Sequence, residues 1–261
     1  MNKLVLVNQE AAIVAVTLNR PARHNSLIPP LLNELLAAFQ KINHDAQVRA
    51  VILQARGRSF STGGDAQGFV DHADHARAYA QEIVGLLNQV ILAMWDCPVP
   101  IVTAVHGIVT GGSMGLVLAS DVVLVAPEAW FAPYYSILGP SPDGGWAVLL
   151  PRIIGRQRAA RVLYTNHHIT AAEAVEWGLA TVIVPAAEIH TAASHMAQEI
   201  AHKKPGSIRH TRQLLNADRP EIARLLAREQ DHFVDHIATP EALNGFRHYL
   251  AERKRQREQP A

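Results

Sequence analysis

The sequence predicts an α/β fold, because short strands and helices alternate along most of the chain. Runs rich in β-branched and other apolar residues predict strands at 4–7, 13–18, 50–53, 101–105 and 122–125. Between these runs, apolar residues recur at the spacing of one helix face. With 261 residues, 49% of them hydrophobic, the chain is long enough to bury a large core in one domain, or in one domain with an appendage.

The first elements are a predicted hairpin and a helix. A polar turn at 8–10 separates the strands at 4–7 and 13–18, which are therefore expected to pair. Ser26 suits the N-cap of the following helix, and Pro29 and Pro30 fit its first turn. The core-facing stripe of this helix consists of Leu31, Leu32, Leu35, Leu36, Phe39 and Ile42.

The middle of the chain continues the alternation. A helix is predicted across 77–95, and the strand at 101–105 leads through a glycine-rich turn into a helix-like apolar segment. After the strand at 122–125, a loop rich in glycine and proline at 139–145 opens a helix that carries Leu149, Leu150 and Ile153.

The last third becomes helical. Thr170 and Glu173 have the spacing of a capping box, so a short helix is predicted there, ending at Gly178 before a strand at 180–184. A boundary is expected at the Lys-Lys-Pro-Gly segment, and helices follow near 207–216, 220–236 and 241–257. We therefore expect an α/β core over residues 1–205 and a helical region over residues 206–261.

Charge and cysteine content limit the possible partners and location. The formal net charge is +1, from 24 Lys and Arg against 23 Asp and Glu. The overall charge therefore does not favour binding to nucleic acid. Cys97 is the only cysteine, and the first apolar run breaks at 8–10, too early for a secretory signal. These features predict an intracellular, cytoplasmic protein.

Neither a membrane span nor a metal site is expected. The uncharged segment at 97–120 is long enough to cross a membrane, but its prolines, glycines and His106 favour a strand, a turn and a buried helix. The chain holds 14 histidines, among them His72 with His75 and the pair at 167–168. No cysteine cluster or His-Glu-x-x-His spacing accompanies them.

Two glycine turns follow predicted strands. One has the sequence Ser-Thr-Gly-Gly-Asp at 61–65, and the other contains Gly111, Gly112 and Gly115. Glycine lets the backbone adopt unusual dihedral angles and lets a ligand approach, and N–H groups at a helix start favour an anion or a developing oxyanion. A glycine pair is also an ordinary tight connection between a strand and a helix. Together, the two turns would supply a two-donor hole for a carbonyl oxygen.

The segments GRSFSTGGD at 57–65 and PIVTAVHGIVTGGSMGLVLASDVVLVAPEAWF at 100–131 resemble the two signature stretches of the crotonase superfamily, the enoyl-CoA hydratase/isomerase enzymes. The resemblance extends from about residue 4 to residue 185, and more weakly through the C-terminal helices. It implies a spiral of strand-strand-helix turns followed by a helical region at 206–261 that covers coenzyme A and mediates trimer formation. The implied assembly is a homotrimer or a homohexamer.

The resemblance also implies a chemistry. In this superfamily, two backbone N–H groups donate to the thioester carbonyl of an acyl-CoA and stabilise the enolate that forms when a nearby carbon loses a proton. The matching donors in this sequence are Gly64 and Gly112. Coenzyme A is part of the substrate in such enzymes, and no prosthetic group is implied.

Proton transfer separates this chain from the hydratases that it resembles. Enoyl-CoA hydratases carry two glutamates, and the matching positions are occupied here by Gly115 and Tyr135. Asp143 remains, in a Pro-Asp-Gly-Gly motif that resembles the branch containing enoyl-CoA isomerases. One carboxylate suffices to move a proton between two carbons beside an oxyanion hole. From the residues alone, Asp143 is equally suited to a turn or a helix cap.

Other functions remain as alternatives to the isomerase. An aspartate at position 143 would suit attack on a haloaryl-CoA, but the dehalogenase branch has a tryptophan where this chain has Tyr135. Hydratase-like or hydrolase chemistry, and a non-catalytic scaffold that keeps the fold, are further alternatives, because fold alone does not fix function.

The resemblance implies further contacts to coenzyme A and the acyl group. The implied coenzyme A contacts are Arg20, Ala22, Arg23, His24, Ser61, Gly63, Asp65, Phe246 and Lys254. The implied acyl pocket includes Gly115, Tyr134 and Tyr135. Arginine suits phosphate through its charge and planar donor geometry. Without the resemblance, the loop from Arg20 to His24 is equally well explained as a polar connection between a strand and a helix. The charged helix with Phe246 and Lys254 would then be a solvent-exposed helix, and Tyr134 and Tyr135 would be core residues.

Overall fold

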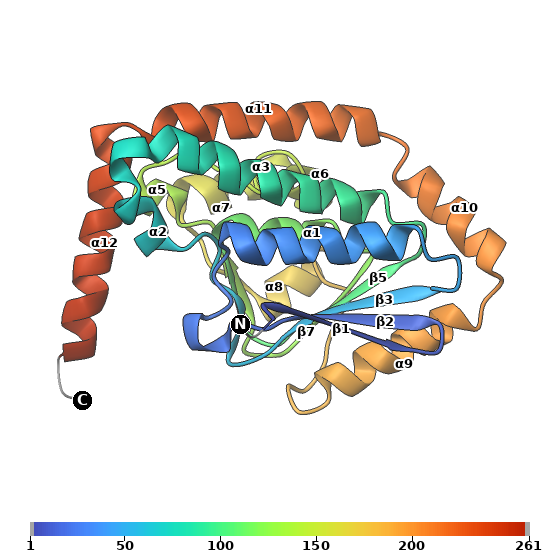
Figure 1. The fold of residues 1–261 in the computed structure, drawn as a ribbon. Coiled ribbons are helices and arrows are strands. Elements are labelled where there is room, and N and C mark those ends of the chain that lie inside the picture. The colour runs from blue at the N-terminus through green and yellow to red at the C-terminus, as the bar shows by residue number, and fades with distance from the viewer. Residues whose placement is uncertain (1–2, 259–261) are drawn as a thin grey trace.

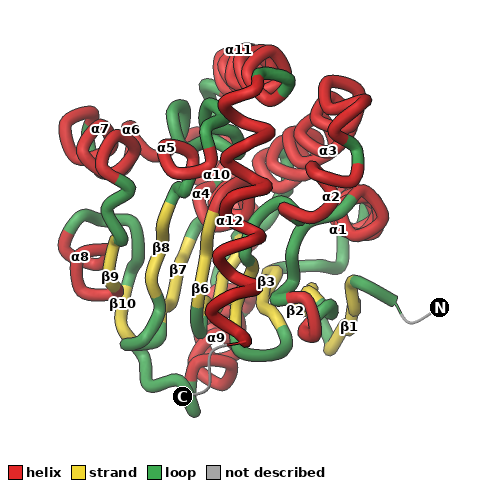
Figure 2. The backbone as a smooth tube through the Cα atoms, turned by 90° about the vertical axis from the view of Figure 1, so that its left-hand side faces the viewer, coloured by secondary structure: helices red, strands yellow, loops and turns green. Residues whose placement is uncertain are grey.

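The computed structural model describes residues 3–258, which form two sheets with helices on their outer faces (Figures 1 and 2). The first sheet contains β1 (Val5–Glu10), β2 (Ile13–Leu18), β3 (Ala50–Ala55), β5 (Ile101–Val105), β7 (Val122–Val125) and β10 (Val182–Ile183), in that order. The second contains β4 (Ser59–Ser61), β6 (Ile108–Thr110), β8 (Trp130–Ala132) and β9 (Ile169–Thr170).

The helices connect these strands and continue beyond them. The first eight are α1 (Pro29–Asn43), α2 (Ala66–Asp71), α3 (Ala76–Trp95), α4 (Met114–Leu118), α5 (Tyr135–Leu138), α6 (Leu150–Ile154), α7 (Arg156–Thr165) and α8 (Ala171–Glu176). The C-terminal ones are α9 (Ile189–Ala201), α10 (Pro205–Leu215), α11 (Arg219–Ile237) and α12 (Pro240–Glu258).

From β3 to β8 the chain follows a spiral in which each turn adds one strand to each sheet. Strands β3, β5 and β7 are parallel neighbours in the first sheet, and β4, β6 and β8 are parallel neighbours in the second. A helix follows each pair of strands, so the predicted strand-strand-helix spiral and the α/β class are confirmed. The predicted hairpin is β1 with β2, which pair antiparallel from Val5 opposite Leu18.

Parallel pairing of β4 with β6 brings the two glycine turns together. Ser61 lies opposite Val109, so both strands end at the same edge of the sheet and the turns that follow them are adjacent. Ser113 Oγ donates hydrogen bonds to the carbonyl oxygens of Ser61, at 3.1 Å, and Thr110, at 2.7 Å. The topology therefore places two sets of backbone N–H groups side by side.

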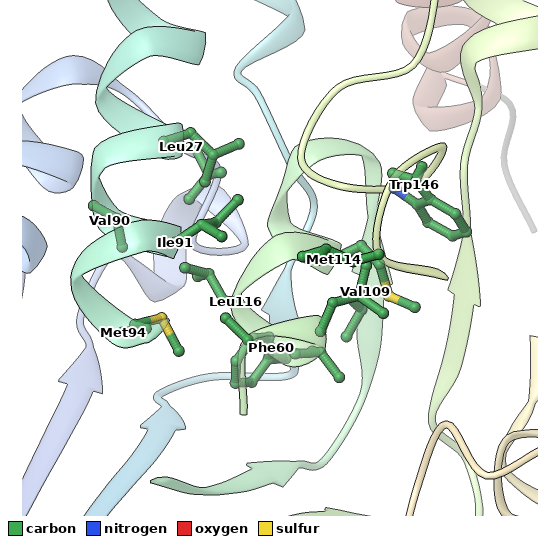
Figure 3. Close-up of a cluster of buried hydrophobic side chains, with 14 of the residues drawn as sticks. Leu27, Phe60, Val90, Ile91, Met94, Val109, Met114, Leu116 and Trp146 are labelled. Atoms are coloured by element: carbon green, nitrogen blue, oxygen red, sulfur yellow. The ribbon is translucent and has the colours of Figure 1, made fainter. Parts of the chain in front are cut away.

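Two hydrophobic layers cover the first sheet. Helices α1 and α3 pack on one face, where Val90, Ile91 and Met94 of α3 lie near Leu116 of α4 (Figure 3). Helix α9 covers the opposite face with Ile189, Ala193 and Ala197 (Figure 1). Residues of β3 alternate between the two layers, as expected for a strand buried on both faces.

The C-terminal helices pack on the core. Helix α11 lies along α3, and α12 descends at one end of the molecule, where it contacts α2 and α5 (Figures 1 and 2). Arg212 of α10 is 4% exposed; it donates to the carbonyl oxygens of Met94, Trp95 and Cys97 and forms an ion pair with Asp121. Helix α10 begins at Pro205, and residues 259–261 of the helical region expected at 206–261 lie outside those described.

Several local predictions need correction. Ser26 does not cap α1: the N-cap is Ile28, without a side-chain bond, and Ser26 Oγ donates to Asp65 at 3.1 Å. The strand predicted at 180–184 is only β10, and the helix after the second glycine turn is a 3₁₀ turn followed by five residues of α4. The capping box at Thr170 and Glu173 is confirmed. Within residues 3–258, no helix is long and apolar enough to cross a membrane.

Candidate active site

A cavity of about 570 Å³ opens beside the two glycine turns. The predicted site residues that line it are Ala22, Arg23, His24, Gly64, Asp65, Gly112, Tyr134, Tyr135, Asp143, Phe246 and Lys254. The predicted site residues outside its lining are Arg20, Ser61, Gly63 and Gly115. The cavity thus brings the two proposed oxyanion donors and the proposed acid/base into one space.

Gly64 and Gly112 both line the cavity. Leu27 and Gly64 form an isolated β-bridge. The Leu27 N–H donates to the Gly63 carbonyl oxygen at 2.7 Å and the Leu27 carbonyl oxygen accepts from Asp65 N–H at 3.0 Å, so both bonds are made by the neighbours of Gly64. Gly112 is the second residue of a 3₁₀ turn, where an N–H has no partner within the turn. Across residues 3–258, neither N–H donates a hydrogen bond. Both are available to a ligand oxygen.

Ser61 and Gly63 lie outside the cavity lining and support the first glycine turn. Ser61 is fully buried, and its Oγ donates to the Asn25 carbonyl oxygen at 2.8 Å. Gly63 has a φ of +72°, and a Cβ at this position would overlap the Thr110 carbonyl oxygen. Only glycine combines this conformation with such a close approach between the two turns.

Asp143 lies against the second glycine turn. A Cβ built on Gly112 would be 3.0 Å from its Oδ2 and 3.2 Å from its Oδ1. Tyr135 donates its hydroxyl to Oδ1 and also to the Asp143 carbonyl oxygen, at 3.1 Å. Burial raises the pKa of Asp143 from 3.8 to about 6, although the Tyr135 hydrogen bond lowers it. A carboxyl group with a pKa near neutrality suits a general acid or base.

The two glycines of the Pro-Asp-Gly-Gly motif explain how Asp143 reaches Gly112. Gly144 has a φ of +64°, and a Cβ there would be 2.5 Å from the Gly112 carbonyl oxygen and 2.7 Å from its Cα. The turn therefore stacks directly on the oxyanion turn, which a larger residue would prevent. Trp146 adds a second link by donating its indole N–H to the Gly111 carbonyl oxygen at 2.7 Å.

Gly115 does not line the cavity, contrary to the prediction. A side chain at this position would overlap Ile91 of α3, and its Cβ would be 2.8 Å from the Gly144 carbonyl oxygen. Tyr135 lies beneath Asp143, buried, and burial raises the pKa of its hydroxyl well above 10. Position 115 thus holds a packed glycine, and position 135 holds a neutral hydroxyl donor.

Arg20 and Asp65 form an ion pair with each other. Arg20 Nη1 contacts Asp65 Oδ2 at 3.0 Å, and Asp65 caps α2 by accepting from Gln67 N–H at 3.2 Å. Burial would raise the pKa of Asp65, but Arg20, Ser26 and Arg23 hold it below its ordinary value. Arg20, a predicted coenzyme A contact, is thus engaged by Asp65 in this structure.

The remaining predicted coenzyme A contacts line the cavity. The Arg23 side chain is 56% exposed and 3.5 Å from Asp65 Oδ2, so its other guanidinium donors reach solvent. Phe246 of α12 stacks on Phe69 of α2, with ring centroids 5.1 Å apart, and Lys254 lies farther along the same helix. Cationic and aromatic groups therefore line the same cavity.

Tyr134 is held at the cavity by local backbone geometry. Its φ is +63°, a left-handed conformation that is uncommon for a bulky residue, and its N–H donates to Asn166 Oδ1 at 2.8 Å. Its ring meets that of Tyr249 edge-on, with centroids 6.2 Å apart. Tyr134 therefore connects the wall of the cavity to α12.

Glu229 is a residue of the site that sequence reasoning missed. Its side chain extends from α11 and accepts the N–H groups of Gly145 at 2.7 Å and Ala147 at 2.8 Å. Burial raises its pKa to about 7, and the charge of Asp143 raises it as well. Helical spacing is the sequence signal that could have found it. Position 229 falls on the buried face of α11, together with Ile222, Leu226, Phe233 and Ile237.

The predicted histidine pairs have structural contacts. His72 stacks on Tyr79, with ring centroids 4.3 Å apart, and His167 Nε2 is 2.9 Å from Glu173 Oε1. In the described part of the chain, no three His, Cys, Asp or Glu side chains are arranged to hold a metal ion.

The sequence matches the enoyl-CoA hydratase/isomerase family over residues 8–260. It is 28% identical over 218 residues to 1,2-epoxyphenylacetyl-CoA isomerase of Escherichia coli (strain K12), an alignment that covers 83% of each chain. It is 34% identical over 210 residues to "Probable enoyl-CoA hydratase EchA12" of Mycobacterium tuberculosis, which covers 78% of this chain and 74% of that protein.

Solved structures agree with this assignment. The structure of an enoyl-CoA hydratase from Mycobacterium avium subsp. paratuberculosis K-10 has a TM-score of 0.86 and 27% identity, covering 95% of this chain and 96% of that one. Both hydratases and an isomerase are therefore similar to this chain. The fold, the two glycine turns and the match over residues 8–260 together show that the protein belongs to the enoyl-CoA hydratase/isomerase family of the crotonase superfamily, whose enzymes act on CoA thioesters.

Proposed function

We propose that this protein is an enoyl-CoA isomerase that moves a carbon-carbon double bond along an acyl-CoA. The observation that carries the proposal is the carboxyl group of Asp143, which lies beside Gly112 in the cavity and accepts a hydrogen bond from Tyr135. Because Tyr135 occupies Oδ1, Oδ2 is the oxygen available for proton transfer. A single acid/base group beside two oxyanion donors suits isomerisation.

The proposed reaction conserves all atoms of the substrate. Asp143 removes a proton from the carbon between the carbonyl group and the double bond of a 3-enoyl-CoA. The electron pair of the broken C–H bond delocalises to the thioester oxygen, which accepts hydrogen bonds from the N–H groups of Gly64 and Gly112. Asp143 then returns the proton to the far carbon of the dienolate, which gives the 2-enoyl-CoA.

Hydration is less well supported by these residues. Addition of water requires one group to activate the water and another to protonate the carbon. The cavity places Asp143 and the neutral Tyr135 together, while Gly115 is packed between Ile91 and the Gly144 carbonyl oxygen. The second carboxylate of the hydratases thus has no counterpart at either matching position.

We also propose how the substrate and the subunits are held. The segment with Ala22, Arg23 and His24 lines the cavity together with Phe246 and Lys254 of α12, and these residues would contact coenzyme A. Residues 206–261 would cover this group and join subunits into a homotrimer or homohexamer, in a cytoplasmic protein.

The test is product analysis with two substrates. Purified protein is incubated with a 3-enoyl-CoA and with the 2-enoyl-CoA of equal chain length, and products are separated by mass and retention time. We expect rapid conversion of the first to the second without a change in mass, and slow addition of water. Asp143→Asn should reduce the isomerisation turnover by at least about 100-fold, the lower range for a general acid/base group. Efficient, stereospecific hydration by the wild type would overturn the proposal.

A further inference from the structure

The carboxylate of Glu229 reaches the active-site turn from a distant part of the chain. It is 7% exposed, and its two oxygens accept the N–H groups of Gly145 and Ala147, residues 84 and 82 positions away. Among the side chains described, those of residues 3–256, no Lys or Arg acts on the charge of Glu229. A buried carboxyl group without a counter-charge is costly to the fold, and its pKa of about 7 reflects that cost. This energetic cost indicates that Glu229 has a role other than stabilising the fold.

The turn at 143–147 is fixed from two sides. On one side, the two N–H groups bind Glu229, and on the other, the Trp146 indole donates to the Gly111 carbonyl oxygen. Asp143 begins this turn, and its carboxyl group lies beside Gly112. The distance between the proposed acid/base and the oxyanion donors therefore depends on both attachments. A side chain with two acceptor oxygens matches the two donors, whereas a glutamine has only one acceptor.

We propose that Glu229 is a positioning residue for the reaction: it holds the turn so that Asp143 faces the reacting carbons of the bound thioester. This inference rests on the proposed function, because it assumes that Asp143 transfers the proton. It assigns to α11, in the C-terminal helical region, a direct part in the geometry of catalysis. Displacing a catalytic group by about 1 Å can cost on the order of 100-fold in rate.

The first test compares two variants of Glu229 with a control on the same helix. Glu229→Gln keeps the size but leaves one N–H without an acceptor, and Glu229→Asp keeps the carboxylate but shortens its reach. We expect kcat to fall about 10- to 100-fold in both, while the affinity for a non-reacting CoA thioester stays within a few-fold. Gln230→Met is the control, because Gln230 is buried beside Glu229 but bonds to Asn88 and Gln81. Its kcat should match that of the wild type.

The second test is a double-mutant cycle with Asp143→Asn. If Glu229 acts through Asp143, Glu229→Gln should cost less than about 3-fold in kcat when Asp143 is already replaced. An equal loss in both backgrounds, or wild-type kcat in both Glu229 variants, would overturn the inference while the proposed function stands. Unchanged isomerisation by Asp143→Asn alone would instead overturn the proposed function, and this inference with it. If Glu229→Gln does not fold, the kcat of Glu229→Asp tests the inference in its place.

Discussion

Replacing Asp143 by asparagine should make the protein more stable at alkaline pH while it removes activity. Burial raises the pKa of Asp143 in the folded protein to about 6, from an ordinary value of 3.8. The unfolded chain therefore loses this proton first, and between these values the folded state binds more protons. The stability that the protonated group provides is complete below pH 3.8 and is lost as the pH rises through about 6.

The size of the effect follows from the two pKa values. The difference between 3.8 and about 6, at about 1.4 kcal/mol for each pH unit, amounts to about 3 kcal/mol. An asparagine at this position avoids the ionisation, and its amide oxygen can still accept the Tyr135 hydroxyl. We therefore expect the free energy of unfolding of Asp143→Asn at pH 8 to exceed that of the wild type by about 2 kcal/mol or more. The advantage should shrink toward pH 4.

The assay is urea unfolding of both proteins at pH 8 and at pH 4.5, at one fixed protein concentration because subunit association also affects stability. Isomerisation turnover is measured on the same preparations. Equal or lower stability of Asp143→Asn at pH 8 would refute the idea that Asp143 is ionised at a burial cost in the folded protein. A stabilised but inactive variant is the expected trade-off between function and stability.

Three further outcomes are expected. Tyr135→Phe removes a hydroxyl that stabilises the Asp143 carboxylate, so it should raise the pKa of Asp143 and move the acid limb of the kcat/KM pH profile to higher pH; an unchanged limb would contradict the contact. Gly144→Ala places a Cβ 2.5 Å from the Gly112 carbonyl oxygen at a φ of +64°, so denaturant unfolding should show a loss of at least about 2 kcal/mol; wild-type stability would disprove the close approach. Light scattering should give the mass of three or six 28.5 kDa subunits, and a monomer at micromolar concentration would argue against a homotrimer or homohexamer.

The longer elements could be predicted from the sequence because their periodicity extends over several turns or alternations. Helices α1 and α3 and the hairpin of β1 and β2 lie within a few residues of their predicted positions. Strands β4, β6, β8 and β9 contain only two or three residues each, which is too short to carry a period. They form the second sheet, so the sequence alone did not reveal what brings the glycine turns together.

The residues of the candidate site likewise differ in how far the sequence could predict them. Gly64, Gly112 and Asp143 could be proposed because each belongs to a recognisable glycine-containing motif, and the structure brings them to one cavity. Ser26 was assigned to a local cap, but an interaction with Asp65, 39 positions away, determines its place. The contact of Glu229 with Gly145 likewise joins residues far apart in the chain. Local patterns carry no information about such partners.

The contact between Glu229 and the 143–147 turn also affects the order in which the protein can mature on the ribosome. During synthesis, Asp143 and the glycine turns emerge well before α11, which supplies the acceptor for the Gly145 and Ala147 N–H groups. A nascent chain that ends before α11 has Asp143 and the two glycine turns without the carboxylate that accepts the Gly145 and Ala147 N–H groups. The contact that fixes the 143–147 turn therefore forms only after α11 has been synthesised, and a chain truncated before α11 cannot form it.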